Sequence, residues 1–346
     1  MTEVEEPDGP TDEELARQVD ERLHELYQRA RGPIDRREAR YYEPGRGYHS
    51  LQEADRREST FGVAMVGLDG DVHGAGAWEQ PFAVQSISKV FAYLLALEDH
   101  GREAVLRRVG VEPSGDSFSS IVFDEASRRP YNPMVNAGAL VTADLVRGTG
   151  GVEVACERVV DLMRRHAGNP DLHVDEGVYA REQEGADRNR ATAYLLRSED
   201  MIEGSADEVL ALYLRQCSVQ VTCRDLAAMA ATLANGGVNP LTGARACDRR
   251  HVRDVLTVMY TCGMYDFAGE WAFEVGVPAK SGVGGGILVP IPGKLGLAVF
   301  SPGLDSHGNS IRGVEVCREI SDRLGLHVFA SEEEDAVLGD PTAVAD

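Results

Sequence analysis

Apolar and polar positions in the first part of the chain predict one helix followed by a β-hairpin. A capping-box pattern at Thr11 indicates the start of the helix, which is expected to end near Arg31, before a Gly-Pro pair. Two apolar stretches, residues 61–68 and 71–77, flank Asp69-Gly70, a dipeptide typical of tight hairpin turns. We therefore expect both stretches to be strands.

Helical periodicity dominates the middle of the chain. One helix is expected to begin near Ser86 and to end at Gly101, with its apolar side chains facing inward. Ser205 and Thr222 are each followed three residues later by an acidic residue, which is the capping-box pattern of a helix start. The further helices that the periodicity predicts cover residues 136–147, 152–166, 187–198, 206–217, 223–235 and 249–262.

Strand patterns return near the C-terminus, ahead of a last amphipathic helix predicted at 310–324. The strands are expected over residues 284–290 and 296–301, joined by a turn at Pro292-Gly293. Because strands occur near both ends and helices fill the middle, the simplest packing is one antiparallel sheet flanked by the terminal helices. We therefore predict an α/β (α+β) fold in which this sheet lies beside a helical lobe, with a cleft between them.

The predicted organisation is a single domain over residues 11–328. Residues 1–10 are expected to be disordered, and the acidic residues 329–346 are expected to form a loose tail. The sheet lobe is expected to comprise residues 11–85 and 263–328, and the helical lobe is expected to comprise residues 86–262.

Composition limits the partners that the chain can bind. Of its 346 residues 43% are hydrophobic, which is an ordinary value for a globular protein. The sequence contains no run of 18 apolar residues, so no membrane-spanning helix is predicted. The formal net charge of −22 would repel nucleic-acid phosphates and anionic membrane surfaces, so neither is expected as a partner. The acidic first ten residues lack the basic and apolar regions of a secretory signal, so we expect a cytoplasmic location.

Cysteine and histidine patterns indicate neither a disulfide framework nor a metal site. The six cysteines form no C-x-x-C pair, and scattered cysteines in a cytosolic chain are typically buried free thiols. The nine histidines do not cluster at the spacing of metal ligands. We therefore predict no metal and no cofactor.

Lysine is rare, and two of the three lysines lie in motifs with catalytic potential. Only three of the 35 basic residues are lysines, namely Lys89, Lys280 and Lys294, and the rest are arginines. Lysine can lose its proton and arginine cannot, so these three positions are candidates for a role that requires lysine. Ser86 and Lys89 form an S-x-x-K pattern, and residues three apart on a helix share a face. A neutral lysine can take the proton of a serine hydroxyl, which is otherwise a weak nucleophile. The pattern by itself is equally compatible with a helix cap followed by a solvated lysine.

The second motif is Lys280-Ser281-Gly282. It precedes a glycine-rich stretch that leads into a predicted strand, and a K-[ST]-G triplet lines the cleft of serine acyl enzymes that contain S-x-x-K. The lysine of such a triplet supplies positive charge, and backbone N–H groups nearby can donate to an oxyanion. The alternative is a glycine-rich bulge at a sheet edge. A phosphate loop is not expected, because no G-K-[ST] follows these glycines.

Other polar residues are weaker candidates. Tyr213 lies on a predicted helix and Tyr265 follows the end of another, and either can pass protons between a nucleophile, a lysine and a leaving group. A buried tyrosine is more often a core residue with a satisfied hydroxyl. Asn136, Glu182 and Asn189 lie in turn-like contexts, where spacing alone favours caps and turn residues.

Seven motifs together resemble the serine-dependent glutaminases, and the resemblance runs from about residue 20 to 328. The motifs are, in chain order, QSISK at 85–89, NPMVNAGA at 132–139, DRN at 187–189, CS at 217–218, MAATLANGG at 229–237, CGMYD at 262–266 and PAKSGV at 278–283. The resemblance implies the fold of β-lactamases and penicillin-binding proteins. It also implies hydrolysis of the side-chain amide of L-glutamine to L-glutamate and ammonia.

The resemblance further implies a catalytic role for each matching residue. Ser86 would form a γ-glutamyl ester, with Lys89 as its base. Tyr213 and Tyr265 would assist in proton transfer and substrate contact. The oxyanion would be held by the backbone N–H groups of Ser86 and Val283.

The substrate contacts implied by the resemblance involve the α-amino and α-carboxyl groups of glutamine. These groups would be held by residues matching Asn136, Glu182, Asn189 and Tyr265, with Gln85 nearby, since a carboxylate can pair with an ammonium and amides can donate to a carboxylate. The family usually has a tyrosine followed by Ile-Pro ahead of the first strand. This chain has Gly47-Tyr48-His49-Ser50-Leu51 there, with different spacing, and Tyr48 is the candidate for that tyrosine.

Two alternatives to a glutaminase remain open at this level. The chain could be another serine acyl hydrolase of the same fold, although such enzymes usually work outside the cytoplasm. It could also be an inactive amino-acid-binding relative, which is disfavoured because Ser86 and both motif lysines are intact. Members of the family are commonly dimers or tetramers, so we expect a homodimer or homotetramer with L-glutamine as its small-molecule substrate.

Overall fold

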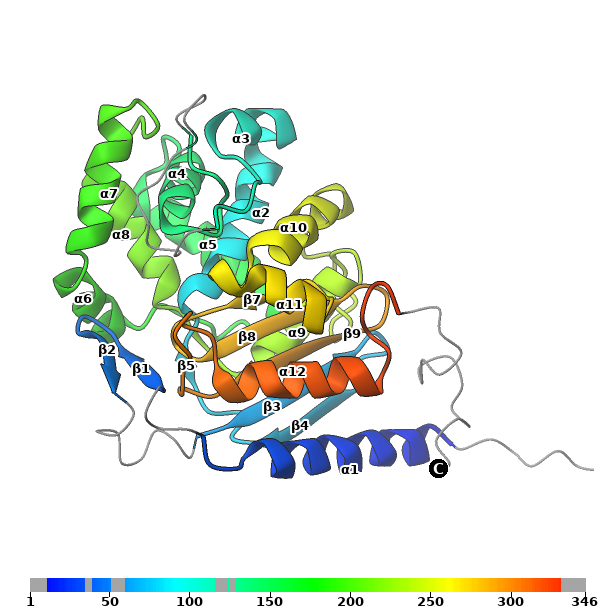
Figure 1. The fold of residues 1–346 in the computed structure, drawn as a ribbon. Helices are drawn as coiled ribbons and strands as arrows, with labels where there is room; N and C mark the ends of the chain where they lie inside the picture. The colour runs from blue at the N-terminus through cyan, green and yellow to red at the C-terminus, as the bar shows by residue number, and fades with distance from the viewer. Residues whose placement is uncertain (1–10, 35–38, 51–59, 116–123, 125–128, 331–346) are drawn as a thin grey trace, which may run out of the picture.

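The structure is a computed structural model, and it consists of a sheet between helices with a group of further helices beside it (Figure 1). This is the predicted class of fold. The tail predicted at 1–10 and residues 331–346 of the tail predicted at 329–346 lie outside the described residues. The described residues are 11–34, 39–50, 60–115, 124 and 129–330.

One antiparallel sheet joins strands from both ends of the chain, as predicted. Its order is β4-β3-β9-β8-β7, so the N-terminal hairpin pairs directly with a C-terminal strand. The contact is between β3 and β9, where Ala64 and Ala298 are opposite each other and fully buried. The strands are β3 (Gly62–Gly67), β4 (Val72–Gly76), β7 (Lys280–Ser281), β8 (Gly286–Ile291) and β9 (Leu295–Phe300).

Helices cover both faces of the sheet, which explains why its central strands are apolar throughout. On one face lie α1 (Asp12–Ala30) and α12 (Ile311–Arg323) (Figure 1). On the other face, α9 (Cys223–Ala234) packs against β3, β8 and β9. The approach of α9 is close, because a Cβ at Gly296 of β9 would lie 2.1 Å from the backbone nitrogen of Ala231. A side chain at this position would therefore push helix and sheet apart.

The helices predicted in the middle of the chain are confirmed. The predicted bounds of α4, α7, α8 and α10 match the structure, and those of α5 and α9 differ by one residue. Thr11 and Thr222 form the predicted capping boxes, and the Ser205 side chain caps α8. Besides α1, α9 and α12, the described α-helices are α2 (Ser88–His100), α3 (Arg102–Arg108), α4 (Asn136–Arg147), α5 (Gly151–Ala167), α6 (Glu176–Glu184), α7 (Asp187–Ser198), α8 (Ala206–Cys217), α10 (Arg249–Cys262) and α11 (Ala268–Glu274).

Two short strand pairs are absent from the sequence prediction. The hairpin of β1 (Arg40–Glu43) and β2 (Gly47–Ser50) lies in a charged, turn-rich stretch. The pair of β5 (Phe82–Ala83) and β6 (Gln220–Val221) joins segments far apart in sequence, just ahead of the predicted nucleophile. Strands of two to four residues are too short for alternation to distinguish them from loops.

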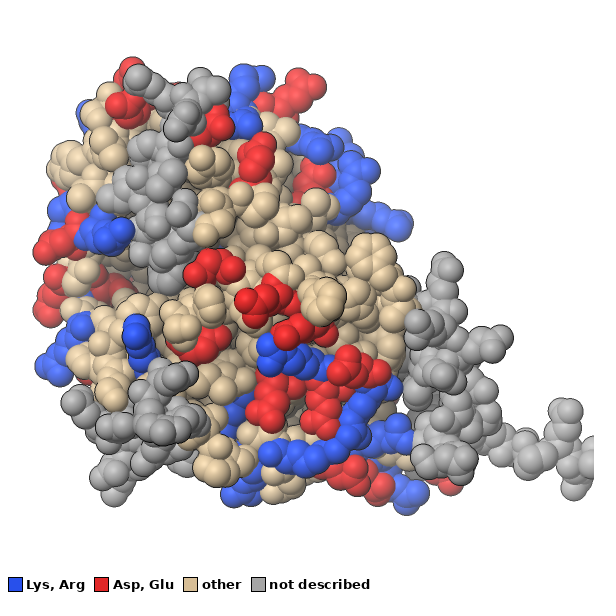
Figure 2. Space-filling view, in the orientation of Figure 1, with Lys and Arg blue, Asp and Glu red and all other residues tan. Residues whose placement is uncertain are grey.

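Acidic and basic side chains intermingle on the face shown in Figure 2, including the region of α1 and α12. Glu319 of α12 pairs with Arg29 of α1 at 3.0 Å and with Arg323 at 2.8 Å. The excess of acidic residues therefore coexists with local pairing between the two terminal helices.

The cysteines agree with the prediction from their spacing, since all six are buried free thiols. Within the described ranges, no group of three or more His, Cys, Asp and Glu side chains has an arrangement that could hold a metal ion. No helix in these ranges combines the length and the apolar character needed to span a membrane.

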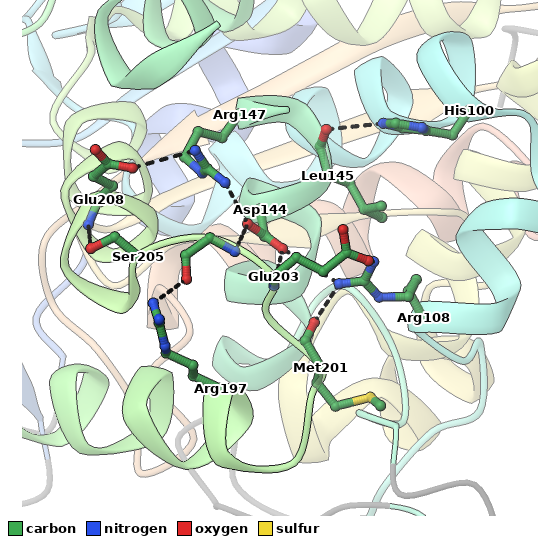
Figure 3. Close-up of polar contacts among 11 residues, drawn as sticks. His100, Arg108, Asp144, Leu145, Arg147, Arg197, Met201, Glu203, Ser205 and Glu208 are labelled. Atoms are coloured by element: carbon green, nitrogen blue, oxygen red, sulfur yellow. Dashed lines mark hydrogen bonds and ion pairs between the residues drawn. The ribbon is translucent and has the colours of Figure 1, made fainter. Parts of the chain in front are cut away.

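A buried carboxylate connects the helices of the helical lobe (Figure 3). Asp144, near the end of α4, is 5% exposed and accepts hydrogen bonds from the backbone N–H groups of Glu203 (2.8 Å) and Gly204 (3.2 Å). The guanidinium groups of Arg108 and Arg147 approach its oxygens at 3.4 and 3.3 Å. Asp144 thus attaches the loop between α7 and α8 to α4, and each of these three helices carries a predicted site residue.

We predict that Asp144→Ala lowers the free energy of unfolding by about 3–5 kcal/mol, because two guanidinium groups and two amides lose a buried partner. Urea unfolding followed by circular dichroism measures the loss. The matched control is Asp161→Ala, which removes an ion pair with Arg165 whose side chains are 55% and 44% exposed. That control is expected to cost less than about 1 kcal/mol. Equal losses in the two variants would contradict the role assigned to Asp144.

Candidate active site

The S-x-x-K motif lies where β5 ends and α2 begins. Residues 85–87 form a 3₁₀ turn, η3 (Gln85–Ile87), and the α-helix starts two residues after Ser86. Lys89 is one turn further along, and its Nζ lies 3.3 Å from Ser86 Oγ. Ser88 points elsewhere, with its Oγ 3.7 Å from Cys217 Sγ. The structure therefore brings together the hydroxyl and the amine that the motif predicts.

Lys89 is buried, and this changes the basicity of its amine. Its side chain is 1% exposed, and Nζ also contacts Asn136 Oδ1 at 2.7 Å and the backbone oxygen of Met134 at 3.2 Å. Burial penalises the charged form and lowers the pKa of Lys89 to about 8. About a tenth of such amines are neutral at pH 7, whereas a solvated lysine is almost wholly protonated.

Asn136, the first residue of α4, connects the amine to two further predicted residues. Its Oδ1 also accepts a hydrogen bond from the Tyr213 hydroxyl at 3.1 Å, and its Nδ2 donates to Asn189 Oδ1 at 2.9 Å. Burial raises the pKa of Tyr213 well above its usual value, so the hydroxyl remains a donor. Side chains from α2, α4, α7 and α8 thus form one continuous set of hydrogen bonds.

Lys280 and Tyr265 form a second group on the sheet side. The amine of Lys280 is buried, donates to the backbone oxygens of Gly263 (2.9 Å) and Ser281 (2.6 Å), and lies 4.2 Å from the centre of the Tyr265 ring. The Tyr265 hydroxyl donates to the backbone oxygen of Ser281 at 2.9 Å and lies close to the Ser86 side chain. Burial lowers the pKa of Lys280 well below its usual range. Through its two hydrogen bonds to backbone oxygens, Lys280 holds the backbone next to the nucleophile.

A glycine turn after β7, residues 282–285, packs against η3. A Cβ at Gly282 would lie 3.0 Å from the backbone oxygen of Val84, and one at Gly284 would lie 2.8 Å from the backbone oxygen of the residue before it. Only residues without a side chain allow so close an approach. Val283 lies between these glycines, so its backbone is next to the turn that carries the nucleophile. The turn also explains why β8 begins at Gly286 rather than at residue 284, as the sequence predicted.

A buried carboxylate lies on the side of α6. Glu182 is 7% exposed, and its Oε1 accepts a hydrogen bond from Gln85 Nε2 while its Oε2 accepts one from the Tyr42 hydroxyl, both at 2.8 Å. Burial raises the pKa of Glu182, and the two hydrogen bonds oppose that rise. Because Gln85 directly precedes Ser86, the carboxylate is attached to the turn that presents the nucleophile.

Two predicted site residues have a backbone conformation that is unusual for residues other than glycine. Gln85 has a φ of 51° and Tyr265 a φ of 60°. Such conformations cost of order 1–3 kcal/mol and persist where surrounding contacts hold them. Here Gln85 is held by Glu182, and Tyr265 is held by Ser281. Both strained residues are therefore close to Ser86, since Gln85 directly precedes it and Tyr265 lies near its side chain.

Tyr48, the sequence candidate for a substrate contact, lies on β2 of the hairpin. It is 41% exposed, and its ring meets that of Tyr42 edge-on, with the centroids 5.6 Å apart. Tyr42 lies opposite Tyr48 in the β1–β2 ladder and makes the hydrogen bond to Glu182. Sequence reasoning missed Tyr42, although Pro44-Gly45 between two tyrosine-containing stretches is a turn signal that could have indicated the hairpin.

The combined arrangement is suited to acyl transfer. A hydroxyl lies beside an amine of lowered pKa, a glycine turn brings backbone alongside it, and a buried carboxylate is available for a cationic group. A cavity of about 280 Å³ opens beside Tyr265 and is lined in part by Asn132, Met134 and Val135. The site therefore borders open space at the segment that leads into Asn136.

Comparisons with known proteins agree with this chemistry. A family model described as Glutaminase matches residues 48–329. A glutaminase of Trichormus variabilis is 56% identical over 269 residues, which cover 78% of this chain and 80% of that protein. Glutaminase 2 of Clostridium perfringens is 46% identical over 281 residues, which cover 81% of this chain and 91% of that protein.

A solved structure, that of Mglu in its glutamate form, has a similar fold. It superimposes with a TM-score of 0.82 at 40% identity, and the match covers 92% of this chain and 71% of that one. The match to the family model spans every motif residue from Gln85 to Val283, and the fold is the β-lactamase-like fold of the family. The chain therefore belongs to the glutaminase family and is an amidohydrolase that acts on glutamine.

Proposed function

We propose that this glutaminase works through a γ-glutamyl ester on Ser86, with Lys89 as the base. The observation that carries the proposal is the 3.3 Å between Lys89 Nζ and Ser86 Oγ. Its second support is the burial that lowers the pKa of Lys89 to about 8. An amine with that pKa can accept a proton near neutral pH, which a solvated lysine does poorly.

In the first half of the reaction, Lys89 takes the hydroxyl proton while Ser86 Oγ attacks the side-chain carbonyl carbon of glutamine. The carbonyl oxygen becomes an oxyanion, which we assign to the backbone N–H groups of Ser86 and Val283. The close packing of the glycine turn against η3 supports this assignment. Lys280 has a supporting role, because its hydrogen bonds to the backbone oxygens of Gly263 and Ser281 hold the segment that leads into the turn.

Collapse of this intermediate breaks the bond between carbon and nitrogen. The leaving nitrogen receives the proton from Lys89, directly or through the Tyr213 hydroxyl, which shares the acceptor Asn136 Oδ1 with that amine. We assign assistance at the same atoms to Tyr265, which lies close to the Ser86 side chain. Ammonia then leaves, Lys89 is neutral again, and the γ-glutamyl group remains on Ser86.

Water completes the reaction by the reverse sequence of proton transfers. Lys89 takes a proton from water as the water oxygen attacks the ester carbon. The second tetrahedral intermediate collapses, Ser86 Oγ regains its proton from Lys89, and glutamate leaves. Glutamine and water are thus converted into glutamate and ammonia, and the enzyme returns to its starting state.

Recognition of a free amino acid is assigned to the polar residues around the nucleophile. Glu182 as a carboxylate would pair with the α-ammonium group, and the contacting amides of Asn136 and Asn189 would serve the α-carboxylate. Gln85 orients Glu182 through its hydrogen bond. Tyr48 remains a candidate contact from the hairpin.

The competing proposals concern the substrate and turnover. Another acyl hydrolase of this fold would prefer a different substrate, and an inactive relative would bind without turnover. Ammonia release from glutamine and asparagine, compared with cleavage of a chromogenic β-lactam, separates these cases. Preference for glutamine supports the proposal, and binding of glutamine without ammonia release contradicts it.

We also propose that the enzyme is a single domain over residues 11–328 that forms a homodimer or homotetramer in the cytoplasm. The basis is its resemblance to glutaminases, whose family model matches residues 48–329. Sedimentation equilibrium of the purified protein tests the assembly, and a monomer at micromolar concentration would contradict it.

Ser86→Ala is expected to lower kcat for ammonia release by a factor of about 10⁴ or more, because it removes the hydroxyl that lies beside the Lys89 amine and forms the ester. The fold should be unchanged, since only one oxygen is removed. The matched control is Ser88→Ala, which removes the same atom from a fully buried neighbour whose hydroxyl faces Cys217. The control should retain activity within about threefold, and substantial turnover by Ser86→Ala would rule out Ser86 as the nucleophile.

The activity is expected to rise with pH through the titration of Lys89. Below pH 8 most Lys89 amines carry a proton and cannot act as the base, so kcat/KM should rise about tenfold per pH unit and level off above its pKa of about 8. NMR of ¹³Cε-labelled lysine provides an independent measurement, because the chain has only three lysines. The resonance that Lys89→Arg removes should titrate with the same midpoint. A midpoint in the usual lysine range, about 10.4, would contradict the account.

A further inference from the structure

The β1–β2 hairpin is attached to both sides of the site. Arg40 and Leu304 exchange backbone hydrogen bonds of 2.9 and 2.7 Å, which join the hairpin to the segment after β9. At its tip, Gly45 has a φ of 79°, and a Cβ there would lie 2.3 Å from the backbone oxygen of Arg181. A Cβ at Gly185 would likewise lie 2.7 Å from the backbone oxygen of Gly45. Two glycines thus let the hairpin rest directly on the C-terminal turn of α6.

This contact places Tyr42 against the buried carboxylate of Glu182. The Tyr42 hydroxyl donates to Oε2 at 2.8 Å, while Gln85 donates to Oε1 from the opposite segment. Burial raises the pKa of Tyr42, so its hydroxyl remains a donor. A buried carboxylate that lacks donors tends to take up a proton, so each of these hydrogen bonds favours the charged form.

We infer that Tyr42 is a positioning residue that holds Glu182 as a carboxylate directed at the α-ammonium group of the substrate. The inference rests on the proposed role of Glu182 in binding glutamine. Tyr42 acts through Glu182 and requires no contact with the substrate itself. It precedes residue 48, where the match to the family model begins.

The surroundings of Glu182 make its protonation measurable. The titratable groups that face it are Tyr42 from β1, Arg181 beside it on α6, and Tyr213 and Cys217 from α8. Burial raises the pKa of Tyr213 and of Cys217, so both remain neutral in acid, and a guanidinium remains charged. A change in substrate affinity between neutral and mildly acidic pH therefore reports on Glu182 among these groups.

The test compares Tyr42→Phe with Tyr41→Phe. The second variant is a matched control, because it removes a hydroxyl from the neighbouring residue of β1, whose ring stacks on His49. Tyr42→Phe takes a donor from a charged acceptor, so KM for L-glutamine should rise about tenfold, equivalent to about 1.4 kcal/mol, with kcat changed less than about threefold. Tyr41→Phe should keep the KM of the parent enzyme.

The pH dependence distinguishes a positioning role from a structural one. Without the Tyr42 hydroxyl, the pKa of Glu182 rises, so protonation begins at higher pH and affinity is lost earlier on acidification. The ratio of KM between Tyr42→Phe and the parent should therefore grow as the pH is lowered from about 8 to about 6. A ratio that is constant across this range would indicate only a loosened hairpin and would overturn the inference.

Glu182→Gln separates failure of this inference from failure of the proposed function. If Glu182→Gln raises KM but Tyr42→Phe leaves it unchanged, the inference is overturned and the role of Glu182 stands. If Glu182→Gln leaves KM unchanged, the proposed binding role of Glu182 fails, and the inference fails with it. When both single variants raise KM, adding Tyr42→Phe to Glu182→Gln should raise KM no further, because the group through which Tyr42 acts is already absent.

Discussion

Removal of the Lys89 amine from water is the constraint on which the whole site depends. A solvated lysine has a pKa of about 10.4 and holds its proton at neutral pH. The buried amine has a pKa of about 8 and lies 3.3 Å from a serine hydroxyl, so it can accept a proton where the chemistry needs an acceptor. A shift of that size corresponds to roughly 3 kcal/mol against the charged form, which the packing of the surrounding fold must offset.

The fold meets this constraint by bringing separate segments to one place. The sheet positions Lys280, which holds the backbone of the glycine turn, while α4 and α8 place Asn136 and Tyr213 beside the amine. The carboxylate of Asp144 attaches the loop between α7 and α8 to α4, so the helices that carry these side chains are held together. The left-handed backbone of residue 85 is maintained by its contact with a buried glutamate. Catalytic geometry and stability thus depend on the same contacts.

Local patterns predicted the longer helices well, because the residues that cap a helix and set its periodicity lie within or next to it, but they did not predict the short helices α3, α6 and α11. The bounds of α4, α7, α8 and α10 agree with the structure, and the capping boxes at Thr11 and Thr222 are present. The S-x-x-K spacing also located the paired hydroxyl and amine, since three residues on a helix share a face. The sheet built from both chain ends followed from the order of strands and helices.

Long-range contacts were harder to predict from the residues. The set of hydrogen bonds from Lys89 through Asn136 to Asn189 joins three helices, and only the family resemblance indicated a role in the site for Asn136 and Asn189. Tyr42 escaped both approaches, because its strand has four residues and its partner Glu182 is 140 positions away. The sequence pointed to Tyr48, which lies opposite Tyr42 on the same face of the hairpin, whereas the hydrogen bond from Tyr42 to the carboxylate is visible only in the structure.

The most direct test of the central claim is mass spectrometry of the protein after brief exposure to a reactive glutamine analogue. One adduct is expected, on Ser86, and none on folded Lys89→Met, because the hydroxyl then has no base. An adduct on another side chain with Ser86 unmodified, or full labelling of Ser86 without the lysine, would contradict the central claim.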